Sequence, residues 1–360
     1  MITEIRLENF KSFKELTKIP LKKITVFIGP NGAGKSTPLQ ALMLLKQSVF
    51  AEGITTQGVF VDLGYNDGLI SVGTAKANYV LGVTFQDESQ LNGKVDIHVP
   101  VKLDSHIDAT SFSREKQAAL KGFIDNIYYI PEWRGFFQSS TEISNVDPDD
   151  PLRNPAVADV ASLVASRLGR NPTLLRKVSD WAQYVVNVRL GYSIARPGAM
   201  FGDGTHVPQQ HILSRLSEEE ATNIVNEGFG SNQLVHLLVQ LALCPRGSFL
   251  AIEEPEAHLH PKAQVALVKV LLERAKEYDL QLVLITHSEH VLHTLLNKVA
   301  SQELTPEDVG ILYFQKENGV SHVKALEVTD RGQVKGGLPG FFEAELEQFS
   351  EFVEALSKRQ

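Results

Sequence analysis

The chain has 360 residues, of which 35 are lysine or arginine and 43 are aspartate or glutamate, so its formal net charge at pH 7 is −8. Its composition of 43% hydrophobic and 22% charged residues is globular, which excludes a disordered, collagenous or disulfide-stapled chain. The acidic balance argues against nucleic-acid binding over the whole surface but leaves room for a local basic patch.

Three features predict a cytoplasmic protein. The single cysteine, Cys244, lies in an apolar run, so we expect it to pack in the core. Residues 1–8 mix apolar and polar residues, unlike a secretory signal. The longest apolar stretch, residues 234–244, is broken by His236 and Gln240 and is shorter than the roughly 20 residues of a spanning helix.

The N-terminal elements begin with residues 4–8, whose alternating pattern predicts a half-buried strand. Residues 24–28 are apolar or β-branched on both faces, which is typical of a buried central strand, and this run stops at Gly29. Apolar residues at helical spacing predict a helix over 35–49. Short apolar runs between glycines, from about 54 to 103, predict an antiparallel β layer.

The composition shifts between about 140 and 230. A turn-forming acidic run at 145–151 precedes two amphipathic patterns. These patterns predict one helix over 155–168, with Asn154 as its cap and Pro155 as its first residue, and another over 174–188. We expect this part of the chain to form a helical insertion.

After residue 230 strands and helices alternate, which is typical of a parallel sheet. The pattern predicts a helix ending at 244, a strand over 249–252, a helix over 263–278, a strand over 282–285 and a helix from 288. Apolar runs at 311–314 and 323–328 flank Asn318-Gly319 and predict a hairpin. The chain is therefore expected to be an α/β protein.

Residues 29–36 fit the pattern G-x-x-x-x-G-K-[ST] between a predicted strand and a predicted helix, as a phosphate-binding loop requires. Small residues let backbone N–H groups surround a phosphate, and the helix N-terminus adds a positive dipole. Lys35 is expected to reach the β- and γ-phosphates of ATP, and Ser36 to bind Mg²⁺. The residues expected to bind ATP are Gly29, Pro30, Asn31, Gly32, Ala33, Gly34, Lys35, Ser36 and Thr37.

Two carboxylates, Glu253 and Glu254, follow the predicted strand 249–252. Ligands bind at the carboxyl ends of strands in open parallel sheets. Because consecutive strand residues point to opposite faces, Glu253 is expected to bind Mg²⁺ and Glu254 to polarise the attacking water. The alternative is an acidic strand end that only leads into the turn at Pro255.

His287 follows the next predicted strand, where a neutral imidazole could hydrogen-bond a γ-phosphate without adding charge. The alternative is a histidine that only caps the following helix. Four more histidines raise the question of zinc, but no H-E-x-x-H pattern and no cysteine partner accompanies them. They are His258, His260, His290 and His293.

Five segments, in this order, resemble the ABC-type AAA-family ATPases related to the RecF, SMC and OLD proteins. They are residues 9–13 (NFKSF), 29–36, 228–233 (GFGSNQ), 252–261 (IEEPEAHLHP) and 285–288 (ITHS), and they span nearly the whole chain. The resemblance implies a P-loop NTPase fold of the ABC-ATPase head type, with a mixed central sheet, an antiparallel β layer and a helical insertion. It also implies ATP and Mg²⁺ as cofactors, and a homodimer that closes around ATP.

The resemblance further implies residue roles. Residues 228–233 take the place of the signature segment, which contacts the γ-phosphate bound to the other subunit, so Gly230 and Ser231 are expected to bind ATP. The alternative for this segment is a flexible lead into a core helix. Residues 257–261 would touch the partner subunit. The catalytic residues expected are Lys35, Glu254 and His287 as the switch histidine, and the metal ligands are Ser36 and Glu253.

Three features depart from the family pattern. The signature segment lacks L-S-G-G-Q, so coupling to a transporter is not expected. Residues 130–134 (IPEWR) stand where many relatives have a glutamine, which leaves that role unassigned. Arg134 is expected either to meet phosphate or a partner, or to form a surface ion pair. Pro38 removes a backbone donor early in the loop helix, which predicts a kink and slower hydrolysis.

We expect three segments. Residues 1–140 form the N-terminal part of the ATPase domain, 141–227 the helical insertion, and 228–360 the C-terminal part with the signature segment, carboxylates, switch histidine, hairpin and a final helix. OLD-type relatives often carry a nuclease domain, but only about 70 residues follow His287, so any nuclease is expected in a partner chain.

Basic clusters make DNA a candidate partner, although such clusters are usually solvated faces. They are Arg167, Arg170, Arg176 and Lys177 in the insertion, and Lys11, Lys14, Lys18, Lys22 and Lys23 near the N-terminus. Two functions remain open. One is an ATP-hydrolysing head coupled to DNA maintenance or anti-phage defence. The other is a nucleotide-gated module with a slow ATPase that controls a partner effector such as a nuclease or toxin.

Overall fold

The fold is described from a computed structural model of the chain. It describes residues 1–50, 56–57, 61–64, 69–73, 78–85, 95–102, 122, 125–136, 141–142, 157–195, 209–215 and 221–338. Three expectations lie outside the described residues: the acidic run at 145–151, the cap at Asn154-Pro155 and the final helix beyond residue 338.

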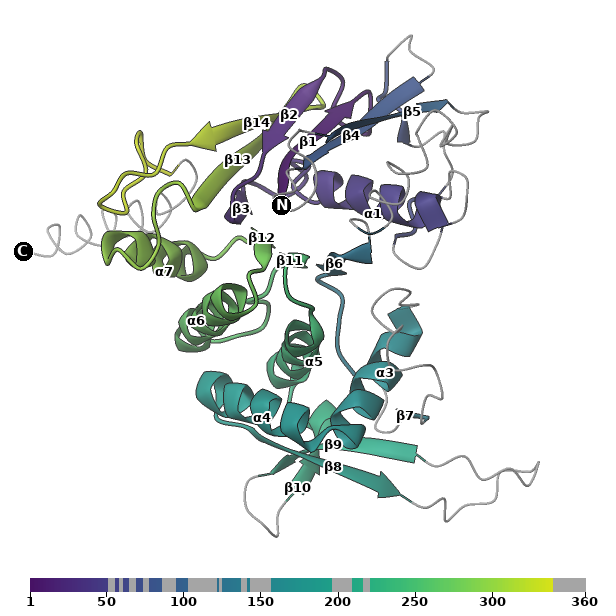
Figure 1. Cartoon of the computed structure of the whole chain (residues 1–360), viewed down its shortest axis with the longest axis vertical. Helices are drawn as coiled ribbons and strands as arrows, with labels where there is room; N and C mark the ends of the chain where they lie inside the picture. The colour runs from purple at the N-terminus through teal and green to yellow at the C-terminus, as the bar shows by residue number, and fades with distance from the viewer. Residues whose placement is uncertain are drawn as a thin grey trace, which may run out of the picture.

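A six-stranded mixed sheet forms the centre of the molecule, in the order β14-β13-β3-β12-β11-β6 (Figure 1). Its strands are β3 (Ile24–Ile28), β6 (Ile127–Ile130), β11 (Phe249–Glu253), β12 (Gln281–Ile285), β13 (Val309–Glu317) and β14 (Val320–Leu326). Neighbours pair in parallel except for β14, which forms the predicted hairpin with β13. The predicted mixed α/β fold is confirmed.

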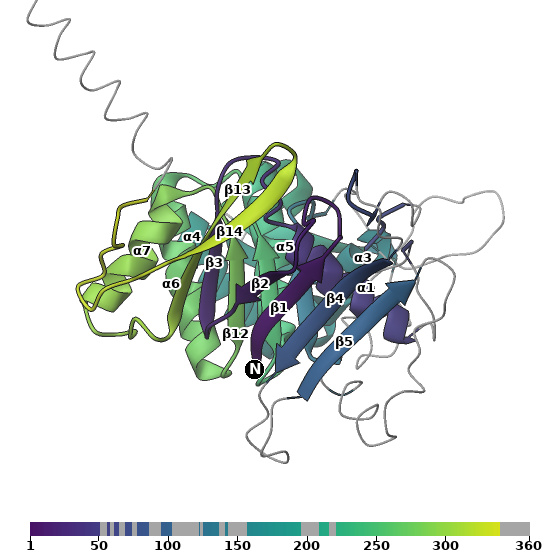
Figure 2. The same ribbon diagram turned by 90° about the horizontal axis from the view of Figure 1, so that it is seen from above.

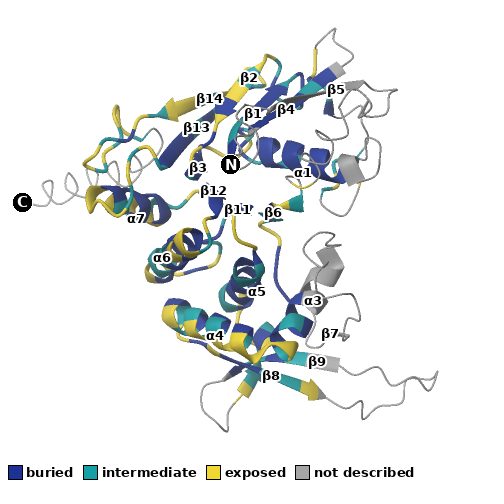
Figure 3. Cartoon of the chain, in the orientation of Figure 1, coloured by how far each residue is buried: buried dark blue, intermediate teal, exposed yellow. Residues whose placement is uncertain are grey.

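Both faces of this sheet are buried, as the apolar runs predict. Alternate residues of β3 divide between two cores: Val26 and Ile28 pack into one, and Phe27 into the other. The first core is covered by α5 (Phe229–Leu243), α6 (Pro261–Glu277) and α7 (Glu289–Ala300). Cys244 lies in this core at 1% exposure, and burial raises the pKa of its thiol to about 12. Figure 3 shows that α5 is buried on nearly all sides.

The second core lies under α1 (Thr37–Phe50) and a four-stranded antiparallel sheet ordered β2-β1-β4-β5. These strands are β1 (Ile2–Glu8), β2 (Thr17–Pro20), β4 (Asn78–Phe85) and β5 (Val95–Lys102). Seen from above, β1, β4 and β5 lie side by side across one face of the molecule (Figure 2). The predicted antiparallel layer is therefore present and includes the N-terminal strand.

The insertion is only partly helical, which corrects the sequence prediction. Its helices α3 (Val157–Arg170) and α4 (Pro172–Val186) pack near a sheet of β7 (Thr141–Glu142), β8 (Arg189–Ala195), β9 (Gln209–Arg215) and β10 (Ala221–Asn223). Three of these strands gave little signal, since β7 and β10 are only two and three residues long and β9 mixes polar and apolar residues. The fourth, β8, alternates Leu190, Tyr192 and Ile194 with Arg189, Gly191 and Ser193 over seven residues, so its signal was present in the sequence and was missed. Residues of α4 four positions apart, Leu174, Val178 and Ala182, are buried in the first core.

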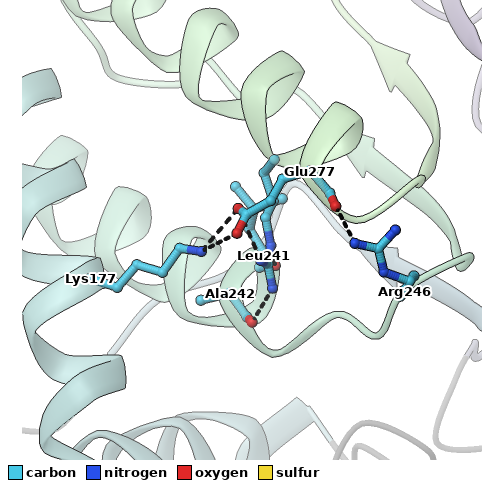
Figure 4. A network of polar contacts seen from close by, with 6 residues as sticks. Lys177, Leu241, Ala242, Arg246 and Glu277 are labelled. Atoms are coloured by element: carbon cyan, nitrogen blue, oxygen red, sulfur yellow. Dashed lines mark hydrogen bonds and ion pairs between the residues drawn. The ribbon is translucent and has the colours of Figure 1, made fainter.

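A polar network fixes the insertion to α6 (Figure 4). Lys177 of α4 pairs with Glu277 of α6 at 3.1 Å and lies over the Trp181 ring. Arg246 donates to the Glu277 carbonyl oxygen at 2.7 Å. One cation of the predicted basic cluster therefore belongs to a contact within the chain. No helix in the described ranges is both long and apolar enough to cross a membrane.

Candidate functional site

A cleft of about 1110 Å³ lies at the carboxyl edge of the central sheet. Five residues to which the sequence assigns chemistry line it together: Lys35, Ser36, Glu253, Glu254 and His287. They end or follow β3, β11 and β12, which are parallel neighbours, so the carboxyl ends of these strands meet at one edge.

The phosphate loop follows β3 in a conformation that depends on glycine. Gly29 and Gly34 have φ of 138° and 97°, in the region that favours glycine. A Cβ on Gly29 would lie 2.1 Å from the carbonyl oxygen of Phe314, and one on Gly34 would lie 2.7 Å from Ser321 Oγ. The hairpin of β13 and β14 therefore packs directly against the loop.

Lys35 is 7% exposed, and its ammonium lies inside the loop. It donates to the carbonyl oxygens of Gly29 and Pro30, both at 2.9 Å. Burial lowers its pKa, while the carboxylates of Glu254 and Glu253 act in the opposite direction. A phosphate bound in the loop would offer this buried ammonium stronger, charged acceptors than the two carbonyls.

The start of α1 tolerates Pro38, which corrects the predicted kink. The helix begins at Thr37 and continues to Phe50. Pro38 is its second residue, where a backbone N–H has no partner within the helix. Thr37 N donates to the Gly34 carbonyl oxygen at 3.1 Å, so that acceptor is already used.

The two glutamates at the end of β11 differ in backbone conformation, so the strand alternation used to predict their roles does not extend to Glu254. Glu253 ends the strand, and Glu254 leaves it with φ of 42°. The alternation of strand residues stops there, and both side chains line the cleft. Glu254 N donates to the Ile285 carbonyl oxygen at 2.8 Å, which ties this turn to the end of β12.

Glu253 fits a Mg²⁺ ligand. Its Oε1 is buried and has no hydrogen-bond partner among the described residues, and such an oxygen calls for a cation or a donor. Ser36 lines the same cleft, and Mg²⁺ prefers carboxylate, hydroxyl and phosphate oxygens. Burial raises the pKa of the neighbouring Tyr129 phenol, and the Glu253 carboxylate raises it further. The phenol is therefore protonated beside this carboxylate.

Glu254 and His287 lie close together, with Oε1 and Nε2 3.8 Å apart. Burial raises the pKa of Glu254, and the carboxylates of Glu132 and Glu256 raise it further. Burial lowers the pKa of His287, so its imidazole is neutral at pH 7 and the contact is not an ion pair. A carboxylate with a raised pKa is suited to accept a proton from water near neutral pH.

Sequence reasoning missed Glu256, which holds the end of β12. Its side chain is 7% exposed and accepts hydrogen bonds from the Thr286 hydroxyl and, at 3.2 Å, from the His287 N–H. The helix cap is Ser288, which accepts from Val291 N, so the alternative of a capping histidine is wrong. The signal available in the sequence was a third carboxylate directly after the turn that follows β11.

Residues 131–136 leave β6 and reach the same edge of the sheet. Glu132 lines the cleft. Arg134 is 3% exposed and donates to the carbonyl oxygens of Glu253 and Glu254, both at 2.7 Å. The expected surface ion pair is therefore wrong, since Arg134 is buried and its acceptors are backbone carbonyls.

The remaining wall of the cleft is basic and comes from distant parts of the chain. Lys11 and Lys14 follow β1, and Lys316 lies near the tip of the β13–β14 hairpin. The Lys11 ammonium donates to Gln40 Oε1 at 2.7 Å. Three lysines on this wall, together with Lys35 in the loop, suit an anionic ligand.

The carboxylate of Glu132 should shift the acid limb of turnover to higher pH, in addition to the larger effect of burial on Glu254. If Glu254 is the base that the sequence predicts, it acts only when ionised, so turnover is expected above its raised pKa and should be lost as the pH falls through that value. Glu132→Gln removes one cause of the rise, so we expect the acid limb of kcat to move to lower pH. A pH profile of ATP turnover measures this, with Glu277→Gln as a remote control. An unmoved limb would contradict the assignment.

A second cleft, of about 990 Å³, lies at the N-terminus of α5. Gly228 precedes the helix with φ of 94°, and a Cβ on Gly230 would lie 2.5 Å from the His258 carbonyl oxygen. Phe229 is 54% exposed and contacts the His258 ring edge-on. Of the described residues that line the phosphate cleft, none comes from this signature segment. The signature segment and phosphate loop of one chain therefore line different clefts.

A phosphate loop between β3 and α1, and carboxylates at the end of β11 beside it, define a P-loop ATPase with the fold of ABC-type heads. The chain belongs to the family described as "AAA domain, putative AbiEii toxin, Type IV TA system", which matches residues 24–293.

Individual relatives agree with this class. The OLD nuclease of Thermus scotoductus is 22% identical over 328 residues, covering 80% of this chain and 59% of the nuclease. The DNA replication and repair protein RecF of Chlorobium phaeobacteroides is 28% identical over 130 residues, which are 36% of this chain and 32% of RecF. The chain therefore spans less than two thirds of these relatives.

The fold is similar to that of a solved Smc head bound to the C-winged helix domain of ScpA. The TM-score is 0.58 at 16% identity, and the match covers 91% of this chain and 97% of the Smc head. At this identity the likeness supports the ATPase head fold alone.

Proposed function

We propose that this ATPase head closes with a second copy of itself around MgATP. The observation that supports this is the separation of the two clefts. The N-terminus of α5 presents N–H groups suited to a phosphate, yet it does not line the phosphate cleft of its own chain. A second copy would supply that contact, with Gly230 and Ser231 facing the γ-phosphate.

Five residues of the phosphate cleft then have roles in hydrolysis: Lys35, Ser36, Glu253, Glu254 and His287. Lys35 and the loop N–H groups hold the phosphates, and Ser36 and Glu253 hold Mg²⁺, which neutralises charge on the phosphate oxygens. Glu254 accepts a proton from the attacking water. The water oxygen bonds to the γ-phosphorus as the bond to the ADP oxygen breaks, giving ADP and phosphate. Neutral His287 hydrogen-bonds the γ-phosphoryl group.

We further propose that hydrolysis serves DNA maintenance or anti-phage defence, which the similarity to RecF and the OLD nuclease supports. A second candidate is a nucleotide-gated module that controls an effector. The family description, which names a putative toxin, favours it. Stimulation of ATP turnover by duplex or single-stranded DNA would support the first function. Unchanged turnover with DNA would support the second.

The dimer is tested by sedimentation with a non-hydrolysable ATP analogue. We expect the wild type to form a dimer only with the analogue and Mg²⁺. Ser231→Arg should bind the analogue normally and stay monomeric, because the larger cation blocks the approach of the second copy. Ser301→Arg, after α7, is the matched control and should dimerise. A dimer of unchanged stability in Ser231→Arg would contradict the proposal.

A further inference from the structure

We name residues 131–136 the coupling segment. This segment contacts the end of β11 through Arg134 and the first turn of α5 through Phe136. It leaves β6 and passes the end of β11 before reaching α5. Arg134 lies in the middle of the segment and is buried. It is not among the described residues that line the phosphate cleft.

At the catalytic end, the guanidinium of Arg134 is bidentate. Nη1 donates to the Glu253 carbonyl oxygen and Nη2 to the Glu254 carbonyl oxygen, both at 2.7 Å. Nη1 also donates to the Pro131 carbonyl oxygen at 3.0 Å, which closes the coupling segment on itself. The planar fork therefore fixes two successive peptide groups, at the place where Glu254 adopts φ of 42°.

The charge of Arg134 suits this position. Four carboxylates surround it: Glu132, Glu253, Glu254 and Glu256. Burial lowers the pKa of the guanidinium to about 10, so it remains charged at neutral pH. A buried cation here offsets the repulsion among carboxylates that the cleft brings together.

At the other end, the segment is joined to α5. Asn232 accepts a hydrogen bond from Phe136 N at 2.6 Å and donates one to the Phe136 carbonyl oxygen at 2.7 Å. The Phe136 ring packs edge-on against His236, one turn further along α5. Gly135 admits this approach, since a Cβ there would lie 2.8 Å from Asn232 Oδ1. Asn232 belongs to the signature segment.

We propose that Arg134 is a positioning residue for ATP hydrolysis, which holds the backbone of Glu254 in its active geometry. Through the contact of Phe136 with Asn232, the position of Glu254 is linked to that of α5, the helix that begins with the signature segment. The inference rests on the proposed role of Glu254 as the base. A displacement of the N-terminal turn of α5 moves the coupling segment, and with it the two carbonyls that Arg134 holds.

The experiment measures kcat and KM for MgATP in the full chain. Arg134→Lys keeps the charge but cannot bridge two carbonyls, so we expect kcat to fall about 100-fold with KM changed less than about threefold. Asn232→Ala, which leaves Arg134 in place, should lower kcat about tenfold at unchanged KM. The double variant should be no slower than Arg134→Lys within about threefold, because both residues act through one contact chain.

Arg274→Lys is the matched control. Arg274 is also buried and donates to two successive carbonyls, those of Leu241 and Ala242, but at the other end of α5. We expect this variant to lose thermal stability and to keep wild-type kcat. If Arg134→Lys does not fold, Asn232→Ala carries the test.

Three results would overturn the inference. The first is a kcat within twofold of wild type in folded Arg134→Lys or Asn232→Ala. The second is a rise in KM of either variant with kcat unchanged. The third is a double variant whose loss of kcat equals the product of the two single losses. Failure of the base assignment is separable, because Glu254→Gln would then retain turnover whatever the Arg134 variants do.

Discussion

Glu254→Gln should reduce kcat by about 10³-fold while leaving ATP binding within about twofold of wild type. The amide keeps the shape and hydrogen-bonding reach of the side chain but cannot take a proton from water. The substitution also removes the negative charge of Glu254, which raises the pKa of the nearby Lys35 ammonium in the wild type. Removing this charge reduces the repulsion of the ATP phosphates. ATP affinity should therefore not fall. Single-turnover hydrolysis and equilibrium binding of ATP measure the two quantities.

The same variant tests the proposed dimer, because a variant that cannot hydrolyse ATP should accumulate this dimer. If hydrolysis ends the closed state, Glu254→Gln with ordinary ATP should build up the ATP-dependent dimer that the wild type forms only transiently. Glu277→Gln, a carboxylate in the remote network of Figure 4, serves as control and should turn over normally. Turnover in Glu254→Gln within tenfold of wild type would exclude Glu254 as the base.

Lys35→Ala should weaken ATP binding about 100-fold, which corresponds to ~2.7 kcal/mol. The buried ammonium is the charged group held within the phosphate loop, and with alanine the loop itself offers only backbone N–H donors to the phosphates. We expect little loss of folding stability, because the change also removes a desolvated charge. Isothermal titration with MgATP and thermal unfolding measure the two effects.

Lys22→Ala is the matched control for this variant. Lys22 also donates to two backbone carbonyls, those of Pro306 and Val309, at 2.7 and 3.0 Å, but it does not line the phosphate cleft. It should bind ATP like the wild type. Equal affinity of Lys35→Ala and wild type would show that the loop N–H groups suffice, and would remove Lys35 from the site.

The strands of the central sheet were predictable because burial on both faces leaves a strong local pattern. Residues 24–28 are apolar or β-branched and residues 282–285 are apolar, and they form β3 and β12 within one residue of the predicted bounds. The sheet of the insertion was not predictable in this way. Its strands, such as β9, carry polar residues whose pairing depends on partners elsewhere in the chain.

The sequence by itself determined the phosphate loop, the carboxylates at the end of a buried strand and the histidine after the next strand. These motifs are local, because each follows directly from a strand whose carboxyl end must lie at the sheet edge. The backbone conformation at Gly29 is also a local property, since a φ of 138° favours glycine whatever surrounds it.

Only the tertiary structure decided what Arg134, Glu256 and Glu132 do. Arg134 acts on carbonyl oxygens 119 and 120 positions further along the chain, and backbone acceptors leave no trace in residue identity. The positive φ of Glu254 could not be predicted either, because this residue donates a hydrogen bond to the backbone carbonyl of Ile285 in β12, and residue identity does not report that contact. Local sequence patterns thus specify which groups reach the edge of the sheet, and long-range packing specifies the orientation and the contacts of each group.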